Sequence, residues 1–214
     1  MQGCMPEINS LKQNADSTET HQLLDRIAQG DSSALDTLVA AHRNYMRRII
    51  ELRMEEGLRC RVDPSDIVQE TSMAVCKRIN EFLVQRPSTF RVWLRYQTLE
   101  RIVDARRHHF AQKRTVKREY RITDASSMSI AQRLRSGPSQ ILRKKELAEQ
   151  VRGVLDRLPD TDREILLLRY MEELTNQEAA EVLGIEPAAS RKRLGRAMRR
   201  LAELLDDNDI SFHP

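Results

Sequence analysis

The chain has 214 residues, of which 32% are charged and 4% are aromatic, and its net charge is +4. So few aromatic side chains favour small helical bundles over one large core, and the modest net charge means that any polyanion is bound locally. The cysteines lie far apart, and the histidines show no metal-ligand spacing with them, so we expect reduced thiols and neither a metal nor a cofactor. No apolar run approaches the ~20 residues of a membrane span and the N-terminus has no signal-peptide core, which predicts a cytoplasmic protein.

The first two predicted helices carry apolar stripes at helical spacing. Residues 1–18 are polar and patternless and are expected to be a disordered tail, and a helix over residues 18–29 ends at Gly30. Asp31 or Ser32 caps a second helix that runs to about Glu56. Its stripe includes His42, which we interpret as a satisfied core histidine because no metal-ligand partner stands at helical spacing.

The third predicted helix combines an apolar face with a polar one. Asp63 is a helix cap followed by Pro64 at the first helical position, and the helix extends to about Leu83. The polar face carries Asp66, Gln69, Met73, Lys77 and Asn80. An apolar Met among polar groups indicates a partner surface, although such surfaces are often merely solvated.

A long basic helix is predicted from about Thr89 to beyond Lys113. Phe90 and Trp93 stand at its start, where we interpret them as core residues. Its distal half is loaded with cations: Arg101, Arg106, Arg107, Lys113, Arg114, Lys117 and Arg118.

Residues 120–143 lack a sustained stripe and carry scattered charges together with Ser126, Ser127, Gly137, Pro138 and Ser139, which predicts a flexible linker. A helix from about Leu142 to Leu158 follows, and Pro159 interrupts it. Thr161 with Glu164 is expected to cap the next helix.

The C-terminal part has the pattern of a helix-turn-helix. Thr175 with Glu178 three residues on forms a capping box for a short helix. Gly184 supplies the left-handed residue after that helix, and Pro187 starts the next one.

The helix after Pro187 has two faces. Leu194, Ala197, Met198, Leu201 and Leu205 recur at helical spacing on the core face. The opposite face carries Arg191, Lys192, Arg193, Arg196, Arg199 and Arg200. No acidic residue lies between positions 187 and 202, so this face is expected to bind an external polyanion instead of forming a solvated lattice of ion pairs.

These C-terminal residues resemble region four of bacterial RNA polymerase sigma factors, in the extracytoplasmic-function (ECF) group of the sigma-70 family. The matching residues are Leu158-Pro159, Arg163-Glu164-Ile165-Leu166, Glu178-Ala179-Ala180, Leu183-Gly184-Ile185, Arg193-Leu194 and Arg196-Ala197. Asp63 to Glu70 resembles region two, and Trp93-Leu94 with Asp104 resembles the minus-ten recognition helix more weakly. Ala189 to Arg193 stands where the family usually has Thr-Val-Lys-Ser-Arg, so the base preference is not transferable. Glu100 stands where the family often has Asn, and an acid there would repel phosphate.

The resemblance implies an assignment of surfaces. Region two would bind the clamp coiled coil of the polymerase beta-prime subunit through Asp63, Asp66, Gln69, Glu70 and Met73. The minus-ten element would contact Arg101, Arg106, Arg107, Lys113 and Arg114. Region four would contact the beta flap and read the minus-thirty-five element with the cationic face after Pro187. The loop at residues 83–88 would capture an unstacked promoter base. An anti-sigma factor, where one exists, would use the same exposed surfaces.

We therefore expect an all-α chain with two small helical domains, residues 19–119 (region two) and 144–206 (region four), joined by the linker, with residues 207–214 as a tail. Its expected function is promoter recognition as a non-catalytic subunit of RNA polymerase. One alternative is a stand-alone helix-turn-helix regulator with an N-terminal partner-binding domain, which leaves Asp63 to Glu70 unexplained. A small nuclease is disfavoured, because Asp63 and Asp66 suit a helix cap and no further residues complete a metal or phosphate site.

Overall fold

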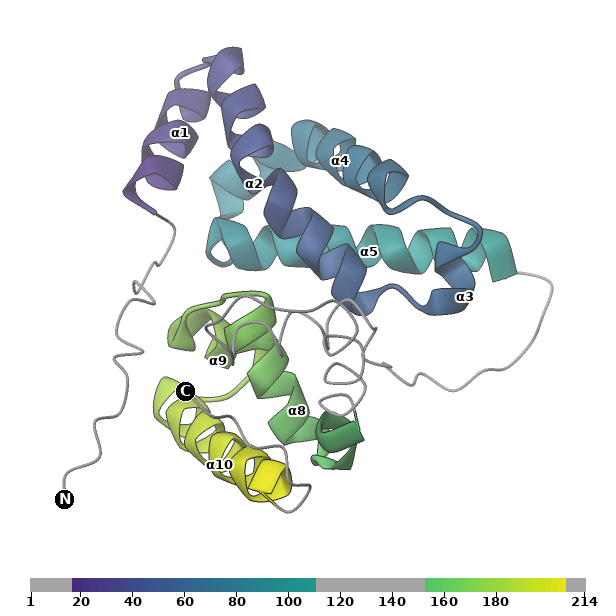
Figure 1. Ribbon diagram of the computed structural model, residues 1–214. Helices are drawn as coiled ribbons and strands as arrows, with labels where there is room; N and C mark the ends of the chain where they lie inside the picture. Colours follow the sequence, from purple (N-terminus) through teal and green to yellow (C-terminus); the bar gives the residue numbers. More distant parts are fainter. Residues whose placement is uncertain (1–16, 111–152, 207–214) are drawn as a thin grey trace, which may run out of the picture.

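A computed structural model describes residues 17–110 and 153–206, and every regular element within these ranges is a helix (Figure 1). The prediction of an all-α chain is therefore confirmed for this part of the sequence. The helices form two groups, α1 to α5 and α8 to α10, which lie one above the other in Figure 1. The predicted linker over residues 120–143, the tail at 207–214 and most of the N-terminal tail lie outside the described residues.

Two helices of the N-terminal domain begin at the side-chain caps that the sequence predicts. The helices of this domain are α1 (Thr18–Ala28), α2 (Ser32–Arg53), α3 (Glu56–Arg59), α4 (Pro64–Gln85) and α5 (Phe90–Phe110). The Asp31 carboxylate accepts the backbone N–H groups of Ser33 and Ala34 at 2.9 and 3.3 Å. The Asp63 carboxylate accepts the N–H of Ser65 at 2.7 Å, with Pro64 in the first turn. These bonds satisfy donors that the first helical turn leaves without intrahelical partners.

The core of this domain lies where α2, α4 and α5 pack against one another. Phe90 is fully buried and Trp93 is 8% exposed, which confirms that both are core residues. Their rings pack on Phe82 at centroid distances of 5.6 and 4.9 Å. His42 is half-buried beside Phe90, with its Nδ1 atom 2.9 Å from the Leu38 carbonyl oxygen, as expected for a satisfied histidine.

The second helix ends earlier than its apolar stripe suggests. It stops at Arg53 instead of Glu56, because Met54 adopts an extended backbone, and the short α3 follows. The side chain of Arg53 is 4% exposed and points out of the domain towards the C-terminal helices. The end of α2 is therefore also a point of contact between the two domains.

The C-terminal domain consists of α8 (Asp160–Leu166), the π-helical turn η1 (Leu167–Met171), α9 (Asn176–Leu183) and α10 (Pro187–Asp206). Residues 153–157, the described part of the predicted preceding helix, are helical. Helix α10 packs across α8 and α9. Among the described elements, every pair of helices with extensive contacts belongs to a single domain.

The predicted cap of the helix after Pro159 is wrong. Helix α8 begins at Asp160 with Pro159 at the cap position, and no side chain caps it. Asp160 and Asp162 instead place negative charge in the first turn, where the helix dipole favours it. Glu164 is directed to Arg53 of the other domain, with two contacts at 2.7 and 2.8 Å. The Glu164 side chain therefore forms an ion pair with Arg53 instead of the local cap that the sequence pattern predicts.

Candidate nucleic-acid interface

The turn before α10 is held by local hydrogen bonds that the sequence predicts. The Thr175 hydroxyl accepts the Glu178 N–H at 3.1 Å, and the Glu178 carboxylate accepts the Thr175 N–H at 2.7 Å, so the capping box is confirmed. Gly184 has φ 63°, the left-handed conformation that favours glycine. The Asn176 amide donates to the Pro187 carbonyl oxygen at 2.9 Å. The start of α10 is therefore fixed against the start of α9.

Helix α10 presents its cations away from the core. Ser190, Ala197, Leu201 and Leu205 are buried, while Leu194 and Met198 are half-buried, so the predicted core face is confirmed. The cations on the other side include the exposed residues Arg191, Lys192, Arg196, Arg199 and Arg200 and the half-buried Arg193. The exposed side of α10 therefore carries a row of cations between Arg191 and Arg200.

Arg200 differs from the other cations of α10, because it pairs with Asp162 of α8. The Asp162 side chain is 3% exposed, whereas that of Arg200 is 49% exposed. The pair joins α10 to α8 and neutralises a carboxylate that would otherwise be buried without a counter-charge. The sequence places Arg200 with the polyanion-binding cations, and the structure shows that it also fastens the helix.

The predicted partner face of α4 is exposed. Asp66, Gln69, Glu70 and Met73 all face solvent, and Met73 is 51% exposed. Asp63 lies at the start of the same face, where its hydrogen bonds with the Ser65 backbone and side chain lower the pKa of its carboxyl. This surface combines acidic groups with an apolar centre, which suits a partner with complementary basic and apolar groups.

The cations of α5 are engaged by acidic residues to a greater degree than the sequence suggests. Arg101 pairs with Glu100 and Asp104 at 3.2 and 3.1 Å, and Arg106 pairs with Glu55 of the α2–α3 connection at 3.0 Å. Arg107 is exposed, 3.9 Å from Asp104. The predicted contacts Lys113 and Arg114 lie outside the described residues. Glu100 is neutralised in part by Arg78 at 3.3 Å as well as by Arg101, which weakens the repulsion of phosphate expected of it.

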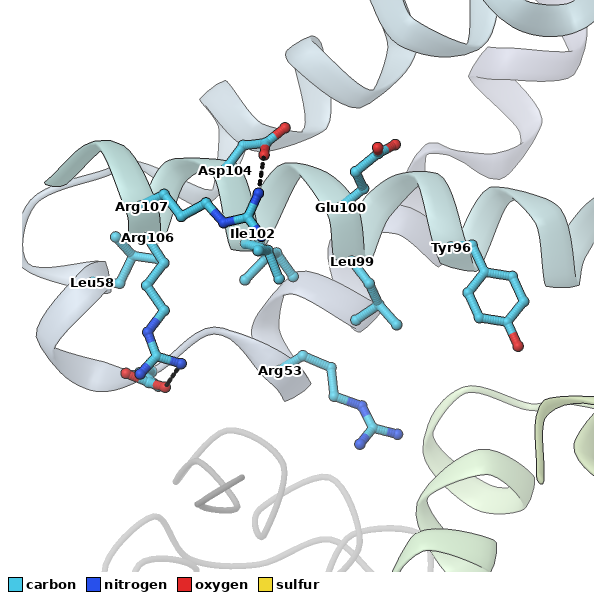
Figure 2. A pocket seen from close by; sticks show the side chains of 11 residues that line it. Arg53, Leu58, Tyr96, Leu99, Glu100, Ile102, Asp104, Arg106 and Arg107 are labelled. Carbon is cyan, nitrogen blue, oxygen red and sulfur yellow. Dashed lines mark ion pairs between the residues drawn. The ribbon is translucent and has the colours of Figure 1, made fainter. Parts of the chain in front are cut away.

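A hollow of about 400 Å³ lies beside α5 (Figure 2). Leu58, Leu99, Ile102 and the half-exposed Tyr96 form its apolar part. Arg106 flanks it at one end, and Arg53 points below it towards the C-terminal domain. The hollow therefore borders the contact between the two domains.

Sequence reasoning missed a cluster of ion pairs between the domains. Arg53 contacts Glu172 at 2.6 Å, and Arg95 contacts the other carboxylate oxygen of Glu172 at 2.6 Å. The Glu172 side chain is 0% exposed, and those of Arg53 and Arg95 are 4% and 6% exposed. Burial raises the pKa of Glu172, but the charges of Arg53 and Arg95 outweigh this and hold it below its ordinary value. One signal was available, since Arg53 continues the apolar stripe of α2, where a charge needs a partner.

Two sequence comparisons relate the chain to known proteins. The family model for sigma-70, region 4, matches residues 148–201. The ECF RNA polymerase sigma factor SigM of Bacillus subtilis (strain 168) is 30% identical over 139 residues, which cover 65% of this chain and 77% of SigM. The probable RNA polymerase sigma factor RfaY of Xanthomonas campestris pv. campestris is 30% identical over 83% of this chain, which spans 42% of the length of RfaY.

A solved structure extends the similarity to the arrangement of the helices. The structure of CnrH in complex with the cytosolic domain of CnrY matches with a TM-score of 0.52 and 26% identity. The match covers 88% of this chain and 98% of that chain. The similarity therefore includes both helical domains.

Proposed function

The chain belongs to the sigma-70 family of RNA polymerase sigma factors, in its extracytoplasmic-function group, and we propose that it binds core RNA polymerase through α4 and directs it to promoters through α5 and α10. The comparisons favour this function over a stand-alone helix-turn-helix regulator. We further propose that the chain itself performs no catalysis and acts in the cytoplasm. No helix within residues 17–110 and 153–206 is long and apolar enough to cross a membrane.

The observation that carries this function is the positive face of α10. The capping box and Gly184 set the direction of the helix, and the buried Ala197 and Leu201 hold it on the domain. Its exposed cations can then enter a DNA groove, where contacts to phosphates give affinity and contacts to base edges give sequence preference. In this proposal Arg191, Lys192 and Arg196 reach the base edges of the minus-thirty-five element.

The other proposed binding surfaces contact either core RNA polymerase or the minus-ten element of the promoter. The exposed face of α4 is proposed to bind the beta-prime clamp coiled coil, and α10's domain the beta flap. Arg101, Arg106 and Arg107 of α5 are proposed to lie near promoter DNA, with Lys113 and Arg114 following them in sequence. The acidic residues paired with Arg101 and Arg106 reduce their net attraction for phosphate, so most of the affinity for DNA should come from α10.

Transcription with purified components tests the function. The full chain, core polymerase and a library of promoter fragments should together give initiation at defined sites, and core polymerase alone should not. Tight, sequence-specific binding by the chain without polymerase, combined with no effect on initiation, would instead support a stand-alone regulator.

A pair of matched variants tests the polymerase surface on α4. Asp66→Lys with Gln69→Ala should weaken binding to core polymerase at least about tenfold, because the charge at an interface rim is reversed and a polar contact removed. Both side chains are exposed, so folding stability should change by less than about 0.5 kcal/mol. The control, Asp36→Lys with Asn44→Ala, reverses one charge and removes one amide at exposed positions of α2, away from the α4 face. Equal affinities for the two variants in a pull-down titration would contradict the assignment of this face.

A further inference from the structure

Helix α10 contains a glycine that nothing within the described chain requires. Gly195 lies well inside α10, which runs from Pro187 to Asp206, so it caps neither end. Its φ is outside the left-handed region, unlike those of Gly30 and Gly184, so other residues fit the same backbone. Apart from the helix's own turn, a Cβ atom at this position would have no heavy atom within 4 Å. Neither backbone conformation nor packing therefore explains the glycine.

The glycine weakens the helix that carries the positive face. In a helix interior, glycine is less favourable than alanine, because it loses more backbone freedom on folding. Alanine already stands at several nearby positions of α10, namely Ala188, Ala189, Ala197 and Ala202. Gly195 thus lowers the stability of α10 without improving any contact within the described residues. Features that lower stability in this way are typical of surfaces that serve binding.

The surface around Gly195 is cationic. Residues three and four positions apart are neighbours on the surface of a helix. For Gly195 these neighbours are Arg191, Lys192, Met198 and Arg199, of which the three cations are exposed and Met198 is half-buried. Bare backbone bordered by three cations suits a polyanion that approaches the helix closely.

Gly195 lies to one side of the positive face. At about 100° per residue, Lys192 is about 60° and Arg196 about 100° around the helix from Gly195, in the same direction. Lys192 and Arg199 are therefore near the middle of the exposed face, with Arg196 on one side of them and Gly195 on the other. One side of the face thus carries a long cation, and the opposite side carries no side chain.

The dimensions of DNA give this asymmetry a consequence. The major groove is about 12 Å wide, and a helix with its side chains has a diameter of about 10–12 Å. A helix in the groove points the middle of its exposed face at the base edges, and its sides meet the sugar–phosphate strands. Because the helix barely fits, a side chain at the side of the face determines how deeply the helix enters.

Resting on the function proposed above, we propose that Gly195 is the point at which α10 packs against a sugar–phosphate strand of the minus-thirty-five element. The missing side chain lets α10 enter the groove deeply enough for Lys192 and Arg196 to reach base edges. Arg199, one turn further along, can hold a phosphate of the same strand. Gly195 is therefore a positioning residue, which acts through the base contacts of its neighbours.

Substitutions at Gly195 test this inference in holoenzyme assembled from the full chain and core polymerase. Gly195→Leu places a bulky side chain at the proposed contact, Gly195→Ala adds only a methyl group, and neither changes the charge of α10. The matched control is Ala202→Leu, at an exposed position seven residues further along and thus on the same side of the helix. Glu203 and Asp206 lie beside this position and repel phosphate, so DNA should not approach it.

The holoenzyme with G195L should bind a promoter fragment at least about tenfold more weakly than the parent, which corresponds to the loss of a good base contact. Its preference for an intact minus-thirty-five element over a substituted one should decrease as well. G195A should show a smaller loss, and A202L should stay within about twofold of the parent. The melting temperature of G195A should nevertheless rise by about 2–4 °C, because alanine is the better helix former. A merely structural role of Gly195 would instead lower both stability and binding.

Unchanged promoter affinity and preference in G195L would overturn the inference. Equal losses in G195L and A202L would do the same, because bulk anywhere on this side of α10 would then suffice. Weaker binding of G195L to core polymerase without DNA would place a protein at Gly195 and would also overturn the contact with DNA. Failure of the parent holoenzyme to select any promoter fragment would contradict the proposed function instead. Binding of the free chain and its variants to duplex DNA at low salt would then still decide whether a DNA strand meets Gly195.

Discussion

The arginines between the two domains and the arginines on α10 show how position determines the role of one side chain. Arg53 and Arg95 are almost completely buried and share carboxylates that come from the other domain. Arg191, Arg196 and Arg199 are exposed on a helix that has no acidic residue between positions 187 and 202. A buried guanidinium needs a fixed counter-charge, whereas an exposed one keeps its charge available for a polyanion. The first set therefore serves the arrangement of the domains and the second serves binding.

The largest expected effect comes from removing one buried arginine. Arg53→Met should destabilise the contact between the two domains by about 3–5 kcal/mol, because it leaves the charge of Glu172 insufficiently compensated. Replacing Arg53, Arg95 and Glu172 together by Met should destabilise this contact far less, since none of the three buried charges remains. Glu164 is partly exposed and can turn to water. Energy transfer between dyes attached at Ala40→Cys and Ala202→Cys, both exposed, with Cys4, Cys60 and Cys76 replaced by Ser, measures both variants. Equal opening of the single and triple variants would contradict the electrostatic account.

A smaller effect distinguishes two neighbouring arginines on α10. Arg200→Ala should lower the free energy of unfolding of the C-terminal domain by about 1–3 kcal/mol, because Asp162 is left buried without its partner. Arg199→Ala, on the exposed face, should change it by less than about 0.5 kcal/mol. Urea denaturation followed by circular dichroism gives both values. Similar losses for the two variants would mean that the Asp162 pair adds nothing to stability.

DNA binding should divide the remaining cations of α10 into two kinds. Lys192→Ala with Arg196→Ala should lose discrimination between bases of the minus-thirty-five element, at about 1–3 kcal/mol for each good bidentate contact. Arg199→Ala should weaken all sequences alike and lower the salt slope by about one unit. Binding to single-base promoter variants at several salt concentrations measures both effects. Arg200 is left unchanged here, since its loss would also disturb the attachment of α10. Identical specificity profiles would falsify this division of the face.

The smallest expected effect is that of pH near neutrality on the ion pairs between the two domains. The pKa of Glu172 is lowered at this contact from its ordinary value of 4.5, although burial opposes this, because Arg53 and Arg95 face it. Its contribution is therefore complete above the ordinary value and is lost only as the pH falls below it. Tyr45 stays neutral, because burial and then the charge of Glu172 raise its pKa. Energy transfer should thus be constant between about pH 6 and 8 and should decrease in acid. A transition near neutral pH would contradict the assignment of Glu172 as the titrating group.

Prediction from sequence succeeded where a feature depends on residues close together in the chain. The capping box at Thr175 and Glu178, the left-handed Gly184 and the start of α10 at Pro187 all involve neighbours within one or two turns. The two faces of α10 follow from helical periodicity alone. The same locality made Phe90 and Trp93 recognisable as core residues at the start of α5.

Prediction failed at Glu164, where a local rule competed with a distant partner. The spacing from Thr161 favours a capping box, but Arg53 offers a charge-assisted, bidentate bond to the same carboxylate. The bidentate pair makes two bonds to a full opposite charge, whereas a capping carboxylate accepts one bond from a backbone N–H, so the longer-range interaction prevails. Arg200 illustrates the same competition, since periodicity places it with the exposed cations and Asp162 takes it as a partner.

The sequence by itself determined the helical class, the caps at Asp31, Asp63 and Thr175, the helix-turn-helix and the cationic face of α10, because each depends on residues within a few positions of one another. Only the tertiary structure decided which charges meet. Arg53 and Glu172 are 119 positions apart, Arg95 and Glu172 are 77 apart, and Arg200 and Asp162 are 38 apart. Pairing across such separations depends on how whole helices pack, and periodicity along one helix carries no information about the partner that the fold brings to its surface.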